Sequence, residues 1–248
     1  MAKKTKDSNQ TLEKQAMQTL LEWLAHGQAK PGQALPLREF SSKFGMSRTP
    51  LRAAAGRLHE QGLLDYDSRY GFTVAIPTKE DLTEFFDMRE MVETYGARSV
   101  IAKRIVIPHE LESIIGELKE LAPKIVEEPG LHNRFWRLDV RFHRALLSLA
   151  GNSRLLELWD QLLVNIRVYQ FGRSMPLSTV RFQTTAEEHE GILQAYKSFD
   201  ADLVVDLLSA HIRRIREQTI AIAIETLESS DEPDWLSRIA PSAAQREL

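Results

Sequence analysis

The spacing of apolar residues predicts two regions of different character, and the first ends near residue 77. Leu20 and Leu24 belong to a stripe at helical spacing over residues 11–26, which Gly27 and "KPGQ" interrupt. Two further helices follow, a short one in "PLREFSSKFG" and a longer one that begins at "MSRTPLR". "LLDYDSRYGFTVAIP" then reads as two short strands around a turn. Helices followed by a hairpin in this order predict a winged helix-turn-helix.

From residue 78 onward the chain shows helical spacing almost throughout and no strand pattern. The predicted helices cover about 79–104, 108–126, 131–150, 153–171, 179–198 and 200–227. The predicted fold is therefore mainly α, an N-terminal winged helix-turn-helix followed by an all-α helical bundle. Four segments are expected: a disordered N-terminus at 1–10, the winged helix-turn-helix domain at 11–77, a helical domain at 78–227 and a tail at 228–248.

Composition narrows the class of protein. The chain of 248 residues is 43% hydrophobic and contains no cysteine, which excludes disulfides and thiolate metal sites. No signal peptide or membrane-spanning run is visible, so we expect a soluble, cytoplasmic protein with no membrane partner. Residues 1–78 hold 11 Lys and Arg against 7 Asp and Glu, and the remainder hold 21 against 28. A basic N-terminal region beside an acidic remainder suggests different partners for the two.

The start of the third predicted helix has the residue types that read DNA. Arg48 and Arg52 lie four residues apart and share one face, and arginine pairs bidentately with guanine or phosphate. Ser47 and Thr49 are able to donate to phosphate at the helix N-terminus. The alternative is that Ser47 and Thr49 only cap the helix and that the arginines form a solvated face.

Polar residues also occur at buried positions of the predicted bundle. Asp139 and His143, in "WRLDVRFHRALLSLAGNSRLL", are four residues apart on one apolar helix face. His189 and His211 lie in two later apolar-periodic helices. Each could be a core histidine with an ordinary partner. If they converge, three imidazoles and one carboxylate suit Zn, Ni, Mn or Fe and leave one or two positions for water or a ligand oxygen.

The N-terminal motifs resemble the DNA-binding domain of the GntR family of bacterial transcription regulators. The matching features are the "PG" turn, "SRTPLR", "GLL" and a wing with glycine at its tip, over residues 11–76. The resemblance implies DNA contacts by Arg38, Ser47, Arg48, Thr49, Arg52 and Gly71. Here the recognition helix continues as Arg52-Ala53-Ala54-Ala55, where the family usually has Arg-Glu-Ala-Leu.

The C-terminal half resembles the FadR-type ligand-binding domain called FCD, over about residues 80–220. Its pattern of D-x-x-x-H, a later E-H-x-x-I and a final H is complete in this sequence. The resemblance implies that Asp139, His143, His189 and His211 bind a divalent metal, with zinc as first choice. That metal would help to hold a small carboxylate effector, such as a sugar acid or organic acid. Arg89, Asn165 and Arg167 are the candidate effector contacts, although an ion pair with Glu93 accounts equally well for Arg89.

Together these features predict a DNA-binding transcription regulator, expected to be a repressor, with no catalytic residues. One recognition helix reads few base pairs, so a homodimer on a palindromic operator is expected. The alternative from another class is a metalloenzyme, because a His₃Asp site with an open position is able to activate water. A third reading keeps the metal purely structural, as a clamp on three helices.

Overall fold

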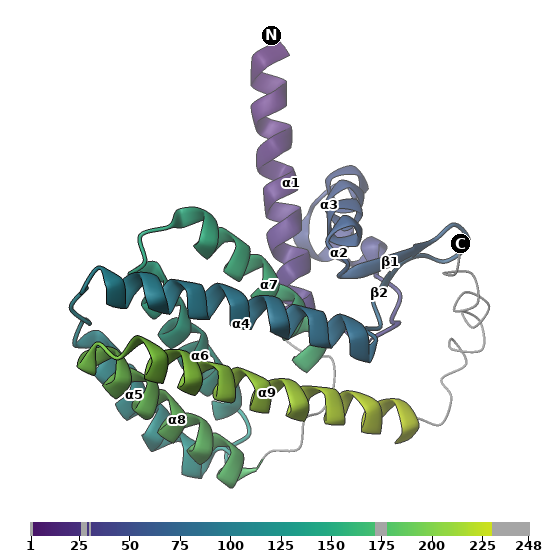
Figure 1. The fold of residues 1–248 in the computed structure, drawn as a ribbon. Helices are drawn as coiled ribbons and strands as arrows, with labels where there is room; N and C mark the ends of the chain where they lie inside the picture. The colour runs from purple at the N-terminus through teal and green to yellow at the C-terminus, as the bar shows by residue number, and fades with distance from the viewer. Residues whose placement is uncertain (1, 26–28, 30, 172–177, 230–248) are drawn as a thin grey trace, which may run out of the picture. The chain divides into compact units, whose positions relative to one another are not determined.

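The computed structural model confirms the mainly helical fold, with one small antiparallel hairpin (Figure 1). It describes residues 2–25, 29, 31–171 and 178–229, with the side chains of 12–24, 29, 31–166, 178 and 180–222. The described chain divides into two compact units. The N-terminal unit comprises the described parts of 1–80, 164–174 and 221–248, and the helical unit comprises those of 81–163 and 175–220.

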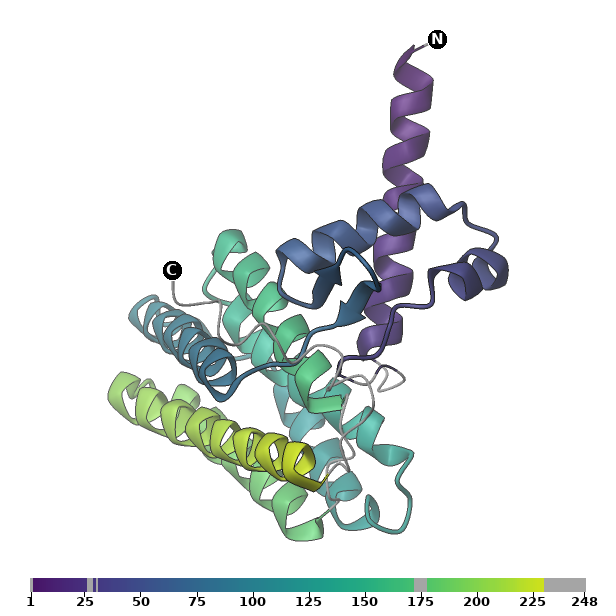
Figure 2. The ribbon, with the colours of Figure 1, turned by 90° about the vertical axis from the view of Figure 1, so that its right-hand side faces the viewer.

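The N-terminal unit contains the expected winged helix-turn-helix. Its elements are α1 (Ala2–Ala25), α2 (Leu37–Phe44), α3 (Arg48–Glu60), β1 (Leu64–Asp67) and β2 (Gly71–Val74). Leu20 and Leu24 of α1 and Leu51 and Leu58 of α3 are completely buried, so the apolar stripes read from the sequence form this unit's core. Figure 2 shows α3 with the hairpin that follows it.

The first helix is longer than expected. Residues 1–10 were predicted to be disordered, whereas α1 begins at Ala2. Its first residues, "AKKTKDSNQ", contain neither glycine nor proline, and alanine, lysine and glutamine are good helix formers. Polarity alone was therefore the wrong criterion for this segment.

The hairpin is stabilised from both sides of β2. On one edge β1 pairs in antiparallel register, with Leu64 opposite Val74 and Asp67 opposite Gly71. On the other edge the segment after the "PG" turn pairs with β2, through Gly32 N to Val74 O at 2.7 Å and Leu35 N to Phe72 O at 2.8 Å. The sequence predicted two strands and missed this third, short edge, which ties the wing to the turn between α1 and α2.

Six α-helices follow the hairpin and supply the helical unit, except that the first residues of α4 and the last residues of α7 and α9 belong to the N-terminal unit. They are α4 (Lys79–Ala102), α5 (Glu110–Leu121), α6 (Leu131–Ser148), α7 (Ser153–Phe171), α8 (Thr179–Ser198) and α9 (Ala201–Ser229), with a short 3-10 turn η1 (Ala122–Lys124) after α5. All six correspond to predicted helices. The one interruption is in the segment predicted as 108–126, where Pro123 lies within η1. The predicted tail falls, from residue 230 onward, outside the described residues.

Helices α4 and α9 lie side by side and run in opposite directions (Figure 1). Glu90 accepts two hydrogen bonds from Arg213, and Asp87 accepts one from Arg216, while Arg98 near the other end of α4 pairs with Asp202. These pairs are distributed along both helices and agree with their antiparallel arrangement. Within the described residues, no helix is long and apolar enough to cross a bilayer.

Candidate metal centre and candidate nucleic-acid interface

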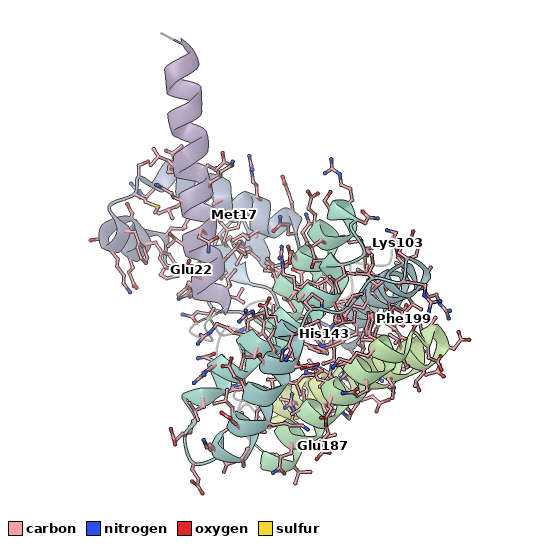
Figure 3. The ribbon with its side chains drawn as sticks, turned by 90° about the vertical axis from the view of Figure 1, so that its left-hand side faces the viewer. Met17, Glu22, Lys103, His143, Glu187 and Phe199 are labelled. Atoms are coloured by element: carbon pink, nitrogen blue, oxygen red, sulfur yellow. The ribbon has the colours of Figure 1, made fainter. Side chains whose placement is uncertain are left out.

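The four predicted ligands converge inside the helical unit. Asp139 and His143 come from α6, His189 from α8 and His211 from α9, and one ligand atom from each lies within 4.8 Å of all the others. The three histidines are completely or almost completely buried, and Asp139 is partly buried. Figure 3 shows His143 among the helices of the bundle. The i, i+4 spacing in α6 thus places both of its polar side chains on the face that α8 and α9 cover.

Two of the distances within the cluster match a metal's coordination shell, while the others are wider, such as the 3.9 Å between Nε2 of His143 and Oδ1 of Asp139. Nε2 of His189 lies 3.3 Å from Oδ1 of Asp139 and 3.0 Å from Nε2 of His143. Donor atoms bound to one zinc ion at about 2.1 Å stand about 3.0–3.4 Å apart. The residues present therefore fit a divalent metal.

Burial keeps two of the imidazoles in the form that binds metals. Burial holds the pKa of His189 well below its usual range, and the neighbouring ring of His211 adds to this effect whenever it is protonated. Burial also lowers the pKa of His211, against the opposing effect of its hydrogen bond with Glu188. Both rings are therefore neutral at neutral pH, and a neutral imidazole offers the lone pair that a metal needs.

A second layer of side chains surrounds the cluster. Nδ1 of His143 lies 2.7 Å from Oε2 of Glu93, whose Oε1 accepts hydrogen bonds from Nε of Arg89 at 2.7 Å and Nε1 of Trp159 at 2.8 Å. Burial opposes ionisation of Glu93, but His143 and Arg89 together hold its pKa well below the usual range. The carboxylate is therefore ionised and satisfied by donors on both of its oxygens.

Glu188 of α8 has the same relation to His211. Nδ1 of His211 lies 2.6 Å from Oε2 of Glu188, and the guanidinium of Arg214 binds both carboxylate oxygens at 2.6 and 2.5 Å. Burial opposes ionisation here too, yet His211 and Arg214 lower the pKa of Glu188 to about 2. The sequence analysis missed Glu188, Arg214 and Trp159. Only Glu188 had a visible signal, because it directly precedes His189.

The predicted effector contacts have different surroundings. Arg89 is buried and forms the ion pair with Glu93 that the sequence offered as its alternative role. Only its Nε takes part, since its terminal nitrogens make no hydrogen bond to the described residues. Asn165 is half-buried on α7, and the side chain of Arg167 lies outside the described residues. All three assignments stay predictions.

The predicted DNA contacts lie on exposed positions of the N-terminal unit. Arg38, at the start of α2, is exposed, as are Ser47, Arg48, Thr49 and Arg52 around the first turns of α3. Ser47 takes the N-cap position of α3, but its hydroxyl makes no capping hydrogen bond. The cap explanation therefore does not account for Ser47.

The wing supplies one partner that the sequence did not reveal. Nη2 of Arg52 donates to the hydroxyl of Tyr66, on β1, across 3.4 Å. Tyr66 thus contacts the arginine whose usual family neighbour, a glutamate, is alanine in this chain. At the tip, Oδ1 of Asp67 accepts from the backbone N of Arg69 and Tyr70, and Gly71 adopts a φ of +80° that favours glycine.

A winged helix-turn-helix joined to a helical bundle with an inward-facing ligand cluster defines a DNA-binding transcription regulator. The model of the bacterial regulatory proteins of the gntR family matches residues 12–74, and the FCD domain model matches residues 84–214. The chain therefore belongs to the GntR family of transcription regulators, in the branch that carries an FCD domain.

Similar proteins agree with this assignment. The HTH-type transcriptional regulator YdhC of Bacillus subtilis is 26% identical over 193 residues, which cover 77% of this chain and 84% of YdhC. The probable D-xylose utilization operon transcriptional repressor of Paenarthrobacter nicotinovorans is 26% identical over 76% of this chain and 80% of its own. Among solved structures, E. coli McbR/YncC has the same fold, with a TM-score of 0.69 at 24% identity over 87% of this chain and 98% of its own. The two sequence relatives are named as transcriptional regulators, and together with the family assignment this decides against the metalloenzyme alternative.

Proposed function

We propose that the protein is a repressor that binds a palindromic operator as a homodimer and responds to a small carboxylate effector held beside a divalent metal. The observation that carries this proposal is the convergence of one carboxylate and three imidazoles from α6, α8 and α9. Two relatives support repression by their names, the repressor of D-xylose utilization and the gluconate operon repressor of Bacillus licheniformis. An operator-binding protein acts where the chromosome lies, so we place it in the cytoplasm.

Asp139, His143, His189 and His211 would hold the metal. Imidazole nitrogen with one carboxylate oxygen suits Zn, Ni, Mn or Fe, and zinc is our first choice because it binds ligands of both kinds and expands to five-coordinate. Such an ion, when bound, supplies a Lewis-acidic position that attracts a carboxylate oxygen. Four protein ligands leave one or two such positions on a five- or six-coordinate ion.

The charges around the site favour an anionic effector. Three carboxylates and three guanidiniums lie in or around the cluster: Asp139, Glu93, Glu188, Arg89, Arg181 and Arg214. Burial and the nearby charge of Arg214 lower the pKa of Arg181 to about 10, so it stays protonated at neutral pH. Because these six charges cancel, a divalent ion leaves uncompensated positive charge, which a carboxylate would offset.

Arg89 is the candidate that best fits a second contact to the effector. Its Nε is anchored to Glu93, and although burial opposes the charged form, Glu93 and then Asp139 raise the pKa of Arg89. The terminal nitrogens therefore keep two parallel donors, the geometry that a carboxylate accepts. Asn165 and Arg167 remain further candidates on α7.

Operator binding would use the exposed face of the N-terminal unit. Arg48 and Arg52 would reach base edges or phosphates, and Ser47, Thr49 and Arg38 would fix the register on the backbone. Gly71 would allow the wing to approach the minor groove closely. Effector binding in the helical unit would change the relative placement of two such faces in the homodimer, and so shift the affinity for a two-half-site operator.

A mobility-shift experiment tests the whole proposal. The DNA is the region upstream of the gene that encodes the protein, and the probes are a panel of sugar acids and organic acids. We expect a sequence-specific, salt-sensitive complex with metal-loaded protein, released by one class of acid. Asp139→Asn should keep the complex and lose the release. If no sequence-specific complex forms at low salt, the proposal is wrong.

A structural metal is the second candidate, because the ligands come from three helices. His189→Ala separates the two roles. A variant that keeps its fold and its DNA binding but loses the effector response supports sensing. A variant that unfolds, seen as loss of the circular-dichroism signal, supports a structural clamp.

A further inference from the structure

Two of the three cluster imidazoles are held by carboxylates in the same way. Glu93 of α4 binds Nδ1 of His143, and Glu188 of α8 binds Nδ1 of His211. In each pair an arginine, Arg89 or Arg214, binds the same carboxylate. Since a carboxylate only accepts, each imidazole must donate from Nδ1. The lone pair on Nε2 of each ring is thereby available to a metal.

We infer that Glu93 and Glu188 are positioning residues that fix the tautomer and ring orientation of His143 and His211 for metal binding. This inference rests on the proposed metal site and extends it to residues beyond the four ligands. Partners of this kind typically change metal affinity by about 10–100-fold when they are removed.

The third imidazole is held differently. His189 Nδ1 is buried and, among the described residues, has no hydrogen-bond partner. The ring stacks on Phe142 instead, with centroids 4.5 Å apart and planes at 25°. Packing therefore orients His189 but does not fix its tautomer. The tautomers of His143 and His211, in contrast, are fixed by their carboxylate partners.

The two oxygens of Glu93 give this inference a sharp test. Oε1 accepts from Arg89 and from Trp159, and both of these groups can only donate. In Glu93→Gln the carbonyl oxygen must therefore take that side, and the amide NH₂ must face Nδ1 of His143. His143 would then accept at Nδ1 and carry its proton on Nε2, where the metal should bind. The substitution keeps the shape and reverses the tautomer.

The matched control is Glu90→Gln on the same helix. Glu90 also binds an arginine through two hydrogen bonds, those from Arg213, but contacts no histidine. Zinc affinity of the full chain would be measured by competition with a chromogenic chelator. We expect Glu93→Gln to weaken zinc binding by about 10–100-fold and Glu90→Gln to change it by less than about twofold. Equal affinities for the two variants would overturn the inference.

Two further measurements separate the possible causes. Long-range ¹H–¹⁵N correlation of the metal-free protein reports the tautomer of His143, which we expect to be Nδ1–H in wild type and Nε2–H in Glu93→Gln. If Glu93→Gln does not fold, Trp159→Phe, which removes one donor to Oε1, should weaken zinc binding by a smaller factor, and unchanged affinity would then overturn the inference. Wild-type protein that binds no zinc would instead contradict the proposed metal site itself.

An independent observation concerns the outer face of α4. Met88, Met91 and Tyr95 form a stripe at helical spacing, and Met91 and Tyr95 are 60% and 61% exposed. Glu84 and Arg98, both exposed, bound the stripe at its two ends. Glu84 makes no ion pair with any other described residue, while Arg98 pairs with the highly exposed Asp202. An apolar strip between opposite charges is typical of an interface.

We propose that this face binds α4 of a second copy of the chain, antiparallel about a two-fold axis at Met91. Met91 lies midway between Glu84 and Arg98, seven residues from each. In an antiparallel pair centred on Met91, Glu84 of each copy therefore faces Arg98 of the other, and the apolar stripes overlap. The stripe would be the interface of the proposed homodimer. Glu84 and Arg98 would neutralise each other's charge across it without any other partner.

The absence of cysteine makes this surface directly testable. Because the natural chain has none, Met91→Cys can form a disulfide only between two copies. The control is Val106→Cys, which is 80% exposed and lies between α4 and α5. We expect mild oxidation to link most of the Met91→Cys protein into dimers and little of the Val106→Cys protein.

Size-exclusion chromatography of the wild-type protein distinguishes a wrongly assigned dimer surface from the absence of a dimer. A wild-type dimer with no excess cross-linking at residue 91 would show that another surface is used. A wild-type monomer at micromolar concentration would contradict the homodimer itself.

Discussion

The two candidate sites of this protein differ in the burial of their side chains and in the number of partners that the protein itself supplies. In the N-terminal unit the proposed DNA-contacting side chains are exposed. Among the hydrogen bonds described above for these side chains, the one to another residue runs from Arg52 to Tyr66. In the helical unit every cluster imidazole is buried, and carboxylates, arginines and a tryptophan surround the group. A surface that reads DNA acquires its partners from the DNA, whereas a buried metal site must bring its partners with it.

This difference predicts that the two sites are lost independently. The largest effect is expected for Asp139→Ala, which removes the cluster's carboxylate ligand. Zinc affinity should fall by more than about 100-fold, beyond the effect of removing an outer partner, while operator affinity without effector stays within about threefold. Chelator competition and mobility shift on one preparation check both values. Equal loss of both activities would show that the metal also supports the DNA-binding form.

The reciprocal change is Arg48→Ala on α3. Loss of a bidentate arginine contact should weaken operator binding by about 1–3 kcal/mol, roughly 5–160-fold. Zinc affinity should remain that of wild type, because Arg48 is exposed on the N-terminal unit. Unchanged operator binding would remove Arg48 from the proposed contacts, and Glu60→Gln at the far end of the same helix serves as control.

Matched glycine substitutions compare the packing of the two units. A Cβ on Gly96 of α4 would lie 2.3 Å from Cδ1 of buried Leu147, whereas one on Gly56 of α3 would meet nothing within 4 Å. Gly96→Ala should therefore lower the free energy of unfolding by about 1–2 kcal/mol, and Gly56→Ala should raise it by about 0.5–1 kcal/mol. Urea denaturation of the full chain measures both. The same sign for both variants would show that Leu147 moves aside without cost.

The smallest effect is expected at the wing. Tyr66→Phe removes the hydroxyl that accepts from Arg52 across 3.4 Å, an exposed and long hydrogen bond. Operator affinity should fall by about two- to threefold, near the lower end of what one hydrogen bond contributes. The titration should be run beside Tyr70→Phe, whose side chain is also exposed on the hairpin. A larger loss for Tyr70→Phe would reassign the contact to the tip.

Sequence reasoning succeeded where residues close together along one helix, or within one short motif, determine the structure. Asp139 and His143 are neighbours on α6 by spacing alone, and the motif "SRTPLR" placed α3 correctly. It did not identify Trp159, which has no special spacing and reaches Glu93 only after α7 packs on α4. Arg214 and Glu188 likewise meet through the packing of α8 and α9. Outer partners depend on tertiary distances that no local pattern encodes.

The distribution of the four ligands along the chain also has a consequence for biosynthesis. His211 follows Asp139 by 72 positions and lies on the last described helix. At about 5–20 residues per second, the ribosome adds His211 about 4–14 s after Asp139. Until then the nascent chain contains only some of the four candidate ligands, and its affinity for a metal would be correspondingly lower. If these residues bind a metal as proposed, its acquisition would be coupled to synthesis of α9, and the metal would meet a finished site rather than a growing one.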